Sequence, residues 1–128
     1  MADGKWNNVV GVQNSAFGRE NSLYGERNYA EGENNNLKGV GNLAVGGGNR
    51  AHGYGNQAYG WKNVAEGEQN YLSGDKNRAT GYYNSANGNG NSLYGQGNSA
   101  HGHRNTLEGQ ENVVWGRRNF AGGISNSV

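Results

Sequence analysis

The 128-residue chain contains no cysteine, no proline and no long hydrophobic run. Without cysteine it forms neither a disulfide nor a thiolate zinc site. It has no apolar run of the roughly 20 residues that a membrane-spanning helix needs, so we expect no membrane insertion. Residues 1–6 lack the apolar stretch of a signal peptide. The net charge of +1 provides no overall attraction for nucleic acid, and we expect no nucleic-acid partner.

Hydrophobic residues are also scarce, at 32% of the chain, and the mean hydropathy is −1.00. Such a composition is typical of disordered chains, because they bury too little apolar surface to offset the loss of chain entropy. Glycine, in contrast, is abundant, with 25 residues. The spacing of these glycines decides between disorder and order.

A seven-residue repeat covers nearly the whole chain. Glycine recurs every seven residues from Gly4 to Gly123, asparagine follows three places later, and Ala, Leu or Val stands two places after each asparagine. Each of the three columns has eighteen members, so the unit is G-x-x-N-x-(A/L/V)-x. Low-complexity disorder would show this composition without this register. We therefore expect a single repeat domain over residues 1–128, without separate caps.

The repeat predicts an all-β parallel solenoid. A coiled coil is excluded, because one glycine in each heptad costs a helix about 1 kcal/mol and a second apolar position is missing. In a strand, the asparagine, the aliphatic residue and the next glycine are spaced by two and point to one face. Since seven is odd, the two variable residues after each glycine must form a corner, where glycine tolerates a positive φ. Two heptads make a flat 14-residue coil, about nine coils in all, and three heptads would make a triangular coil.

The positions of the leucines favour the flat coil. A 14-residue phase places Leu23, Leu37, Leu93 and Leu107 on one sheet and Leu72 on the other, opposite alanines, as a thin core of constant thickness requires. The expected core residues include Val9, Ala16, Leu23, Leu37, Leu72, Leu93, Leu107, Val114 and Val128.

The asparagines are expected to form structural ladders inside the coil. Each amide can bond the asparagines of the coils above and below it and the corner backbone, which stabilises the interior only if every polar group is satisfied. The predicted ladder residues are Asn7, Asn14, Asn21, Asn28, Asn35, Asn42, Asn49, Asn56, Asn63, Asn70, Asn77, Asn84, Asn91, Asn98, Asn105, Asn112, Asn119 and Asn126.

The repeat resembles those of two known families. G-x-x-N-x-V-x is similar to the repeat of the grass ice-binding proteins, and units such as 53–59 (GYGNQAY) and 95–101 (GQGNSAH) resemble the head repeats of YadA-type trimeric autotransporter adhesins. Both resemblances imply a left-handed β-roll, and the resemblance to the ice-binding proteins also implies 14-residue coils. The resemblance to the adhesins implies assembly into trimers, and the resemblance to the grass ice-binding proteins implies ice binding. Ice-binding faces carry ranks of Thr, Ser or Val, whereas this chain has only two threonines, Thr80 and Thr106.

The outward strand positions separate into two unequal faces. The sheet built on Val9, Leu23 and Leu37 exposes five charged residues, Lys38, Arg50, Glu66, Arg78 and Glu108, and the opposite sheet exposes one, Glu31. A charge-poor face is typical of a partner surface, although Tyr and β-branched residues also simply suit strands. The predicted self-association face consists of Phe17, Tyr29, Leu43, Val45, Tyr59, Tyr71, Val113 and Trp115.

No catalytic or metal-binding pattern is present. The three histidines stand at exposed variable positions, and His101-Gly102-His103 has no carboxylates beside it to complete a metal site. We therefore expect no enzyme activity, no cofactor and no metal. The exposed corner aromatics Tyr54, Trp61, Tyr82 and Tyr83 are suited to stacking on sugar rings.

These features favour a structural or adhesive rod that associates with itself. Ala2 and Val128 both stand at core positions, so we expect either a segment of a longer array or a subunit that stacks end to end into a filament. A trimer is the other expected assembly, with a cell-surface, matrix or carbohydrate ligand and an extracellular or cell-surface location. A monomeric ice-binding roll is the alternative function, and a designed sequence would show the same pattern.

Overall fold

The computed structural model describes all residues from Met1 to Val128 and confirms the parallel β-solenoid of about nine 14-residue coils. Eighteen strands form two nine-stranded parallel sheets. The odd sheet contains β1 (Ala2–Lys5), β3 (Ser15–Arg19), β5 (Tyr29–Glu33), β7 (Leu43–Gly47), β9 (Gln57–Trp61), β11 (Tyr71–Asp75), β13 (Ser85–Asn89), β15 (Ser99–His103) and β17 (Val113–Arg117). The even sheet contains β2 (Asn8–Val12), β4 (Ser22–Glu26), β6 (Asn36–Val40), β8 (Arg50–Tyr54), β10 (Val64–Glu68), β12 (Arg78–Tyr82), β14 (Ser92–Gln96), β16 (Thr106–Gln110) and β18 (Phe120–Ile124).

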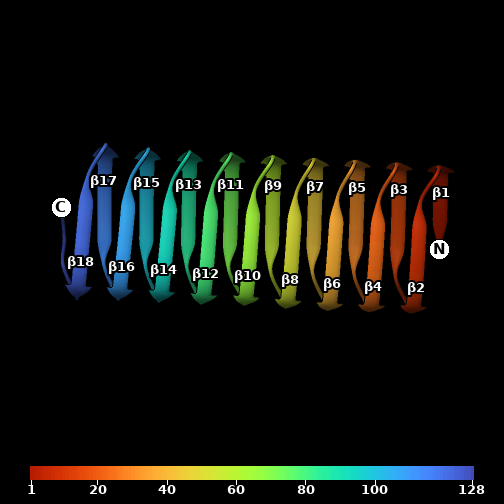
Figure 1. The fold of residues 1–128 in the computed structure, drawn as a ribbon, viewed down its shortest axis with the longest axis horizontal. Coiled ribbons are helices and arrows are strands. Elements are labelled where there is room, and N and C mark those ends of the chain that lie inside the picture. Colours follow the sequence, from red (N-terminus) through yellow and green to blue (C-terminus); the bar gives the residue numbers. More distant parts are fainter.

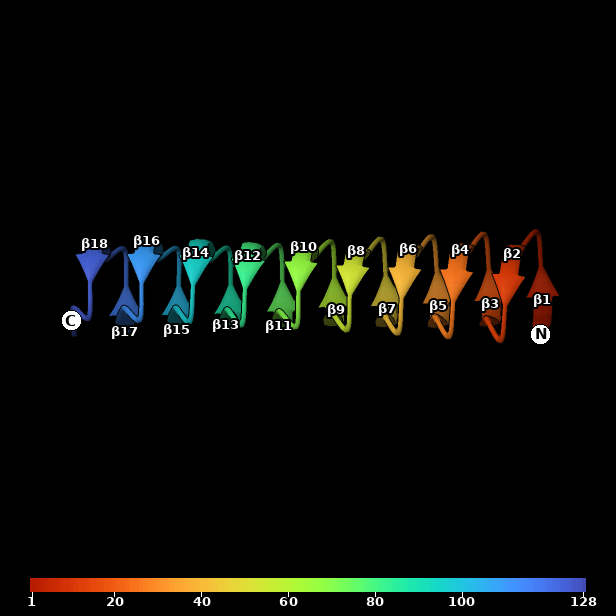
Figure 2. The same cartoon turned by 90° about the horizontal axis from the view of Figure 1, so that it is seen from below.

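The two sheets stack as the layers of a straight rod with the termini at opposite ends (Figure 2). In Figure 1 the chain runs from right to left, rises along the more distant odd strands and descends along the nearer even strands, so the coil is left-handed. Each strand pairs with the strand 14 residues further on, for example Ala16 with Ala30 and Gly18 with Gly32. The structure contains no helix, and therefore none of the length and apolar character needed to cross a bilayer.

The aliphatic column forms the thin core. Leu23, Leu37, Leu93 and Leu107 lie in the even sheet and Leu72 in the odd sheet, as the leucine pattern predicted. All core positions from Ala16 to Val114 are fully buried. Val9 is only partly buried, and Val128, predicted as core, is 55% exposed. The reason is that the first and last coils are covered by a neighbouring coil on one side only.

The asparagine column lies inside the coil and is satisfied there. In a typical case Asn63 Oδ1 accepts a hydrogen bond from the backbone N–H of Asn77 at 3.0 Å. Asn63 Nδ2 donates to the carbonyl oxygens of Tyr59 at 2.9 Å and Gly74 at 2.7 Å. The fifteen asparagines from Asn14 to Asn112 are buried, whereas Asn7 and Asn119 are half-buried and Asn126 is exposed. The ladder thus joins consecutive coils and supports the start of each corner.

The repeat glycines lie within the strands, and their corner role differs from the prediction. The residue directly after each glycine is still part of its strand, and the tight turn is made by the second residue after it, which has a φ of 52° to 68° in every coil. The repeat glycines themselves have φ between 105° and 121°. A Cβ on any of them from Gly4 to Gly109 would overlap the carbonyl oxygen of the glycine 14 residues later. Glycine is therefore required because the coils approach closely.

Candidate interaction surfaces

The eight residues predicted as a self-association face all lie on the odd sheet, but the structure divides them into two groups. Six of them, the apolar patch, lie on the adjacent strands β3 to β11: Phe17, Tyr29, Leu43, Val45, Tyr59 and Tyr71. Val113 and Trp115 lie apart on β17. The strands between them, β13 and β15, carry Ser85, Asn87, Ser99 and His101 at the outward positions. The apolar surface of this face is therefore interrupted at β13 and β15.

Aromatic contacts between neighbouring strands order the apolar patch. Phe17 and Tyr29 have ring centroids 5.6 Å apart, and Tyr59 and Tyr71 have ring centroids 5.7 Å apart. The hydroxyl of Tyr59 donates to Gln57 Oε1 at 3.3 Å. Tilted aromatic pairs at such distances stabilise the surface beyond the burial of area. The rings of neighbouring strands thus contact one another within the apolar patch.

The charge on the odd sheet is slightly larger than predicted. Glu31 lies on it as expected, and the sheet register also places Asp3 beside Phe17, so two carboxylates rather than one stand on this face. Asp3 was missed because Ala2 and Asp3 precede the first glycine of the repeat. The hydroxyl of Tyr29 donates to Glu31 Oε2 at 3.0 Å, and this hydrogen bond, with burial and the charge of Glu31, raises the pKa of Tyr29.

The even sheet presents the predicted charges as an ordered network. Glu66 lies between two arginines, with Oε1 4.0 Å from Arg50 Nε and Oε2 3.8 Å from Arg78 Nη2. This face is not purely polar, since Val10, Tyr24, Tyr94 and Phe120 are exposed on it as well. The two faces therefore differ mainly in their charge, five charged residues against two, and less in their aromatic content.

His52 lies within this charged network and is expected to be neutral at pH 7. Its Nε2 is 2.9 Å from Asn36 Oδ1, and Nη2 of Arg50 approaches its Nδ1 at 3.5 Å, so both contacts are favourable when the proton is on Nε2. Burial, and next the positive charge of Arg50, lower the pKa of His52 below its ordinary value of 6.5, while Glu66 opposes and Lys38 adds to this effect.

An NMR titration of the histidines tests this arrangement. We expect His52 to titrate below pH 6.5, and Arg50→Gln to raise its pKa toward the ordinary value. Because the folded state then binds fewer protons than the unfolded chain, the free energy of unfolding should fall as the pH drops through 6.5. A His52 pKa at or above 6.5, or one unmoved by Arg50→Gln, contradicts the assignment.

The corners form two long edges of the rod with different side chains. The first edge follows the odd strands and carries Trp61, and the second edge follows the even strands and carries Tyr54, Tyr82 and Tyr83. Trp61 is therefore separated from the three tyrosines. The ring of Trp61 also lies over Gly47 of the preceding coil, where a Cβ on that glycine would strike it.

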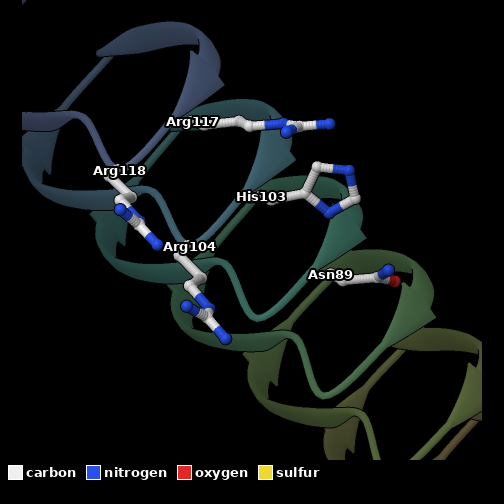
Figure 3. A pocket seen from close by; sticks show the side chains of 5 residues that line it. All are labelled: Asn89, His103, Arg104, Arg117 and Arg118. Atoms are coloured by element: carbon white, nitrogen blue, oxygen red, sulfur yellow. The ribbon is translucent and has the colours of Figure 1, made fainter.

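The first edge contains a basic trough that the sequence analysis did not identify. Its volume is about 550 Å³, and it is lined by Asn89, His103, Arg104, Arg117 and Arg118. Figure 3 shows Arg117, His103 and Asn89 as one row and Arg118 and Arg104 as a second row, both following the rod. A smaller hollow lined by Asp75, Lys76, Asn89, Gly90 and Arg104 continues it along the edge.

The motif His101-Gly102-His103 is divided between two surfaces. His101 stacks on Trp115 on the odd sheet, with ring centroids 4.5 Å apart and an interplanar angle of 7°, whereas His103 lines the trough. No three His, Asp or Glu side chains lie together in a way that could hold a metal ion.

Comparison of the chain with protein-family models finds no match, and comparison with curated proteins finds none either.

Proposed function

We propose that the protein is a non-enzymatic structural rod that associates side by side with copies of itself through the odd sheet. The observation that carries this proposal is the apolar patch on five adjacent strands, Phe17, Tyr29, Leu43, Val45, Tyr59 and Tyr71, on a face with two charges. A flat, ordered, charge-poor face on a polar chain is typical of a surface that a partner covers.

A second copy of the chain is the partner that fits this face by shape and size. Eight strand spacings and five residues of strand make the face about 38 Å by 17 Å, or roughly 600 Å². A specific interface buries roughly 800 Å² on each partner, so the face suits a small interface between two flat sheets. Since part of it is polar, we expect weak association, with a dissociation constant of about 10 µM.

The interior supports a structural rather than a catalytic role. Apart from Gly47, every buried residue is Ala, Leu, Val or Asn, none of which transfers a proton or attacks a substrate. The likeness of the repeat to adhesin head repeats agrees with a rod that presents its variable side chains to a partner. An extracellular or cell-surface location belongs to the same proposal.

A charge-pair variant tests the self-association. Val45 lies between Glu31 on β5 and Tyr59 on β9, so Val45→Lys/Tyr59→Glu introduces two charges that pair within one chain, and we expect the fold to be retained. Burying them against a second copy would be costly. By light scattering across a concentration series, we expect the unmodified protein to exceed its monomer mass of 13.6 kDa and the variant to remain at it.

The even sheet offers a matched control. Val10 and Tyr24 are the same residue types in the same register on β2 and β4, and Tyr24 lies beside Lys38, so Val10→Lys/Tyr24→Glu should leave the association unchanged. Trp115→Glu tests the separate group on β17, and we expect only a small effect. An unmodified protein that stays monomeric at about 500 µM, about 50 times the expected constant, overturns the proposal. Thermal hysteresis in that case would favour the ice-binding alternative.

A further inference from the structure

The trough on the first edge belongs to a longer basic row. The second residue after each repeat glycine makes the tight turn, and along this edge from β9 onward these residues are Lys62, Lys76, Gly90, Arg104 and Arg118. Since the coils are about 4.8 Å apart, four cations stand along roughly 19 Å of edge, and His103 and Arg117 flank them.

The charge of this row is largely uncompensated. Its five cationic residues, including Arg117, are accompanied by one carboxylate, Asp75, whereas six of the eleven basic and nine of the ten acidic residues lie elsewhere. The edge therefore carries a net charge of +4 and the rest of the chain −3. The four ion pairs of the structure involve Arg19, Arg27, Arg50 and Arg78 only, so the guanidinium groups of Arg104, Arg117 and Arg118 have no carboxylate within 4.0 Å.

We propose that this edge binds a sulfated polysaccharide, lying along the rod in the trough between the two rows. Guanidinium groups bind sulfate and phosphate oxygens through paired N–H donors, and Arg104 and Arg118 stand on consecutive coils. A sugar residue lengthens a linear polysaccharide by about one coil spacing, so successive anionic groups meet successive coils. Asn89 and His103 add further hydrogen-bonding groups on the other side of the trough.

The surroundings favour a polysaccharide over single-stranded nucleic acid. Nucleic-acid grooves combine cations with aromatic rings on which the bases stack. No Phe, Tyr or Trp side chain lines the trough, and Trp61, at the start of the basic row, lies over Gly47 of the preceding coil. The inference does not depend on the proposed self-association, because the edge stays open when the odd sheet is covered. The two proposals can also fail separately: this one fails if the saccharide does not bind, and the self-association fails if the protein keeps its monomer mass.

Binding of a size-defined heparin hexasaccharide, measured by calorimetry over a range of salt concentrations, tests the proposal. The variant is Arg104→Gln/Arg118→Gln. Glutamine already occupies this turn position at Gln13 and Gln69, so we expect the turns to be retained. We expect the unmodified protein to bind with salt-dependent affinity and the variant to bind at least about tenfold more weakly. Arg19→Gln/Arg27→Gln, which removes the same charge from arginines paired with glutamates, should bind within about twofold of the unmodified protein.

Three outcomes overturn the proposal. The first is that the unmodified protein does not bind the hexasaccharide, or binds the desulfated form equally well. The second is that both double variants lose the same affinity, since overall charge rather than the trough would then be responsible. The third is that a single-stranded oligonucleotide of equal charge binds as tightly, which would assign the edge to nucleic acid. Circular dichroism of each variant establishes that the solenoid is retained.

Discussion

Gly39→Ala is expected to abolish the native solenoid or to lower its free energy of unfolding by roughly 4 kcal/mol or more. Gly39 lies in β6 with a φ of 120°, a backbone conformation that residues with a side chain rarely adopt. A Cβ there would also overlap the carbonyl oxygen of Gly53 on the next coil. The clash is with backbone, so no rotamer relieves it. The two coils would have to separate, which breaks the ladder between β6 and β8. Urea unfolding followed by circular dichroism measures the effect.

Gly41→Ala is the matched control, two residues further along the same chain segment. Gly41 has a φ of 67°, but a Cβ there meets nothing within 4 Å. Thirteen other turns carry a non-glycine residue at this position. We expect a loss of about 1 kcal/mol at most. Equal losses for the two variants would show that backbone conformation, rather than the approach of the coils, explains the repeat glycine.

Asn63→Ala is expected to lower the free energy of unfolding by about 3 to 5 kcal/mol. The change leaves the backbone N–H of Asn77 without its acceptor and removes the donor to the carbonyls of Tyr59 and Gly74. Each unsatisfied buried group costs about 1 to 3 kcal/mol, and the missing side chain also leaves a cavity. Asn87→Ala, at an exposed position of β13, should change stability by no more than about 0.5 kcal/mol.

Asn63→Asp separates the hydrogen bonds from the shape of the side chain. A carboxylate at this buried position faces the carbonyl oxygens of Tyr59 and Gly74 without a donor, so its pKa in the folded state should rise above its unfolded value of about 3.9. The folded state then holds the proton longer than the unfolded chain. The variant should therefore become less stable, relative to the unmodified protein, as the pH rises from about 4 to 7. A pH-independent difference would contradict a buried, satisfied ladder.

The coil itself could be predicted because its determinants recur in register. The same three positions of the repeat carry glycine, asparagine and an aliphatic residue eighteen times each, so every heptad has the same local structure. The alternation of Leu and Ala at a 14-residue phase indicates two sheets. The assignment of the outward residues to the faces followed from the same phase. Asp3 was missed because it stands before the first full unit of the repeat.

The basic trough could have been found by applying the 14-residue phase to the corners, where Lys76, Arg104 and Arg118 fall into one column. Counting the charges at all corners together does not reveal this column, because successive corners of the chain lie on opposite edges of the rod. The two rows of side chains that line the trough could not have been predicted in this way, because they depend on the directions in which side chains leave each turn (Figure 3).

The sequence by itself determined the coil length, the burial of the asparagines and the identity of the core, because each follows from spacing within 14 residues. Only the tertiary structure decided which corner residue makes the turn and why the repeat position must be glycine. It also divided the apolar face and left Arg104, Arg117 and Arg118 without a carboxylate partner. These features depend on contacts between coils, such as that of Gly39 with Gly53, and on which turns of the chain become neighbours when the coils stack.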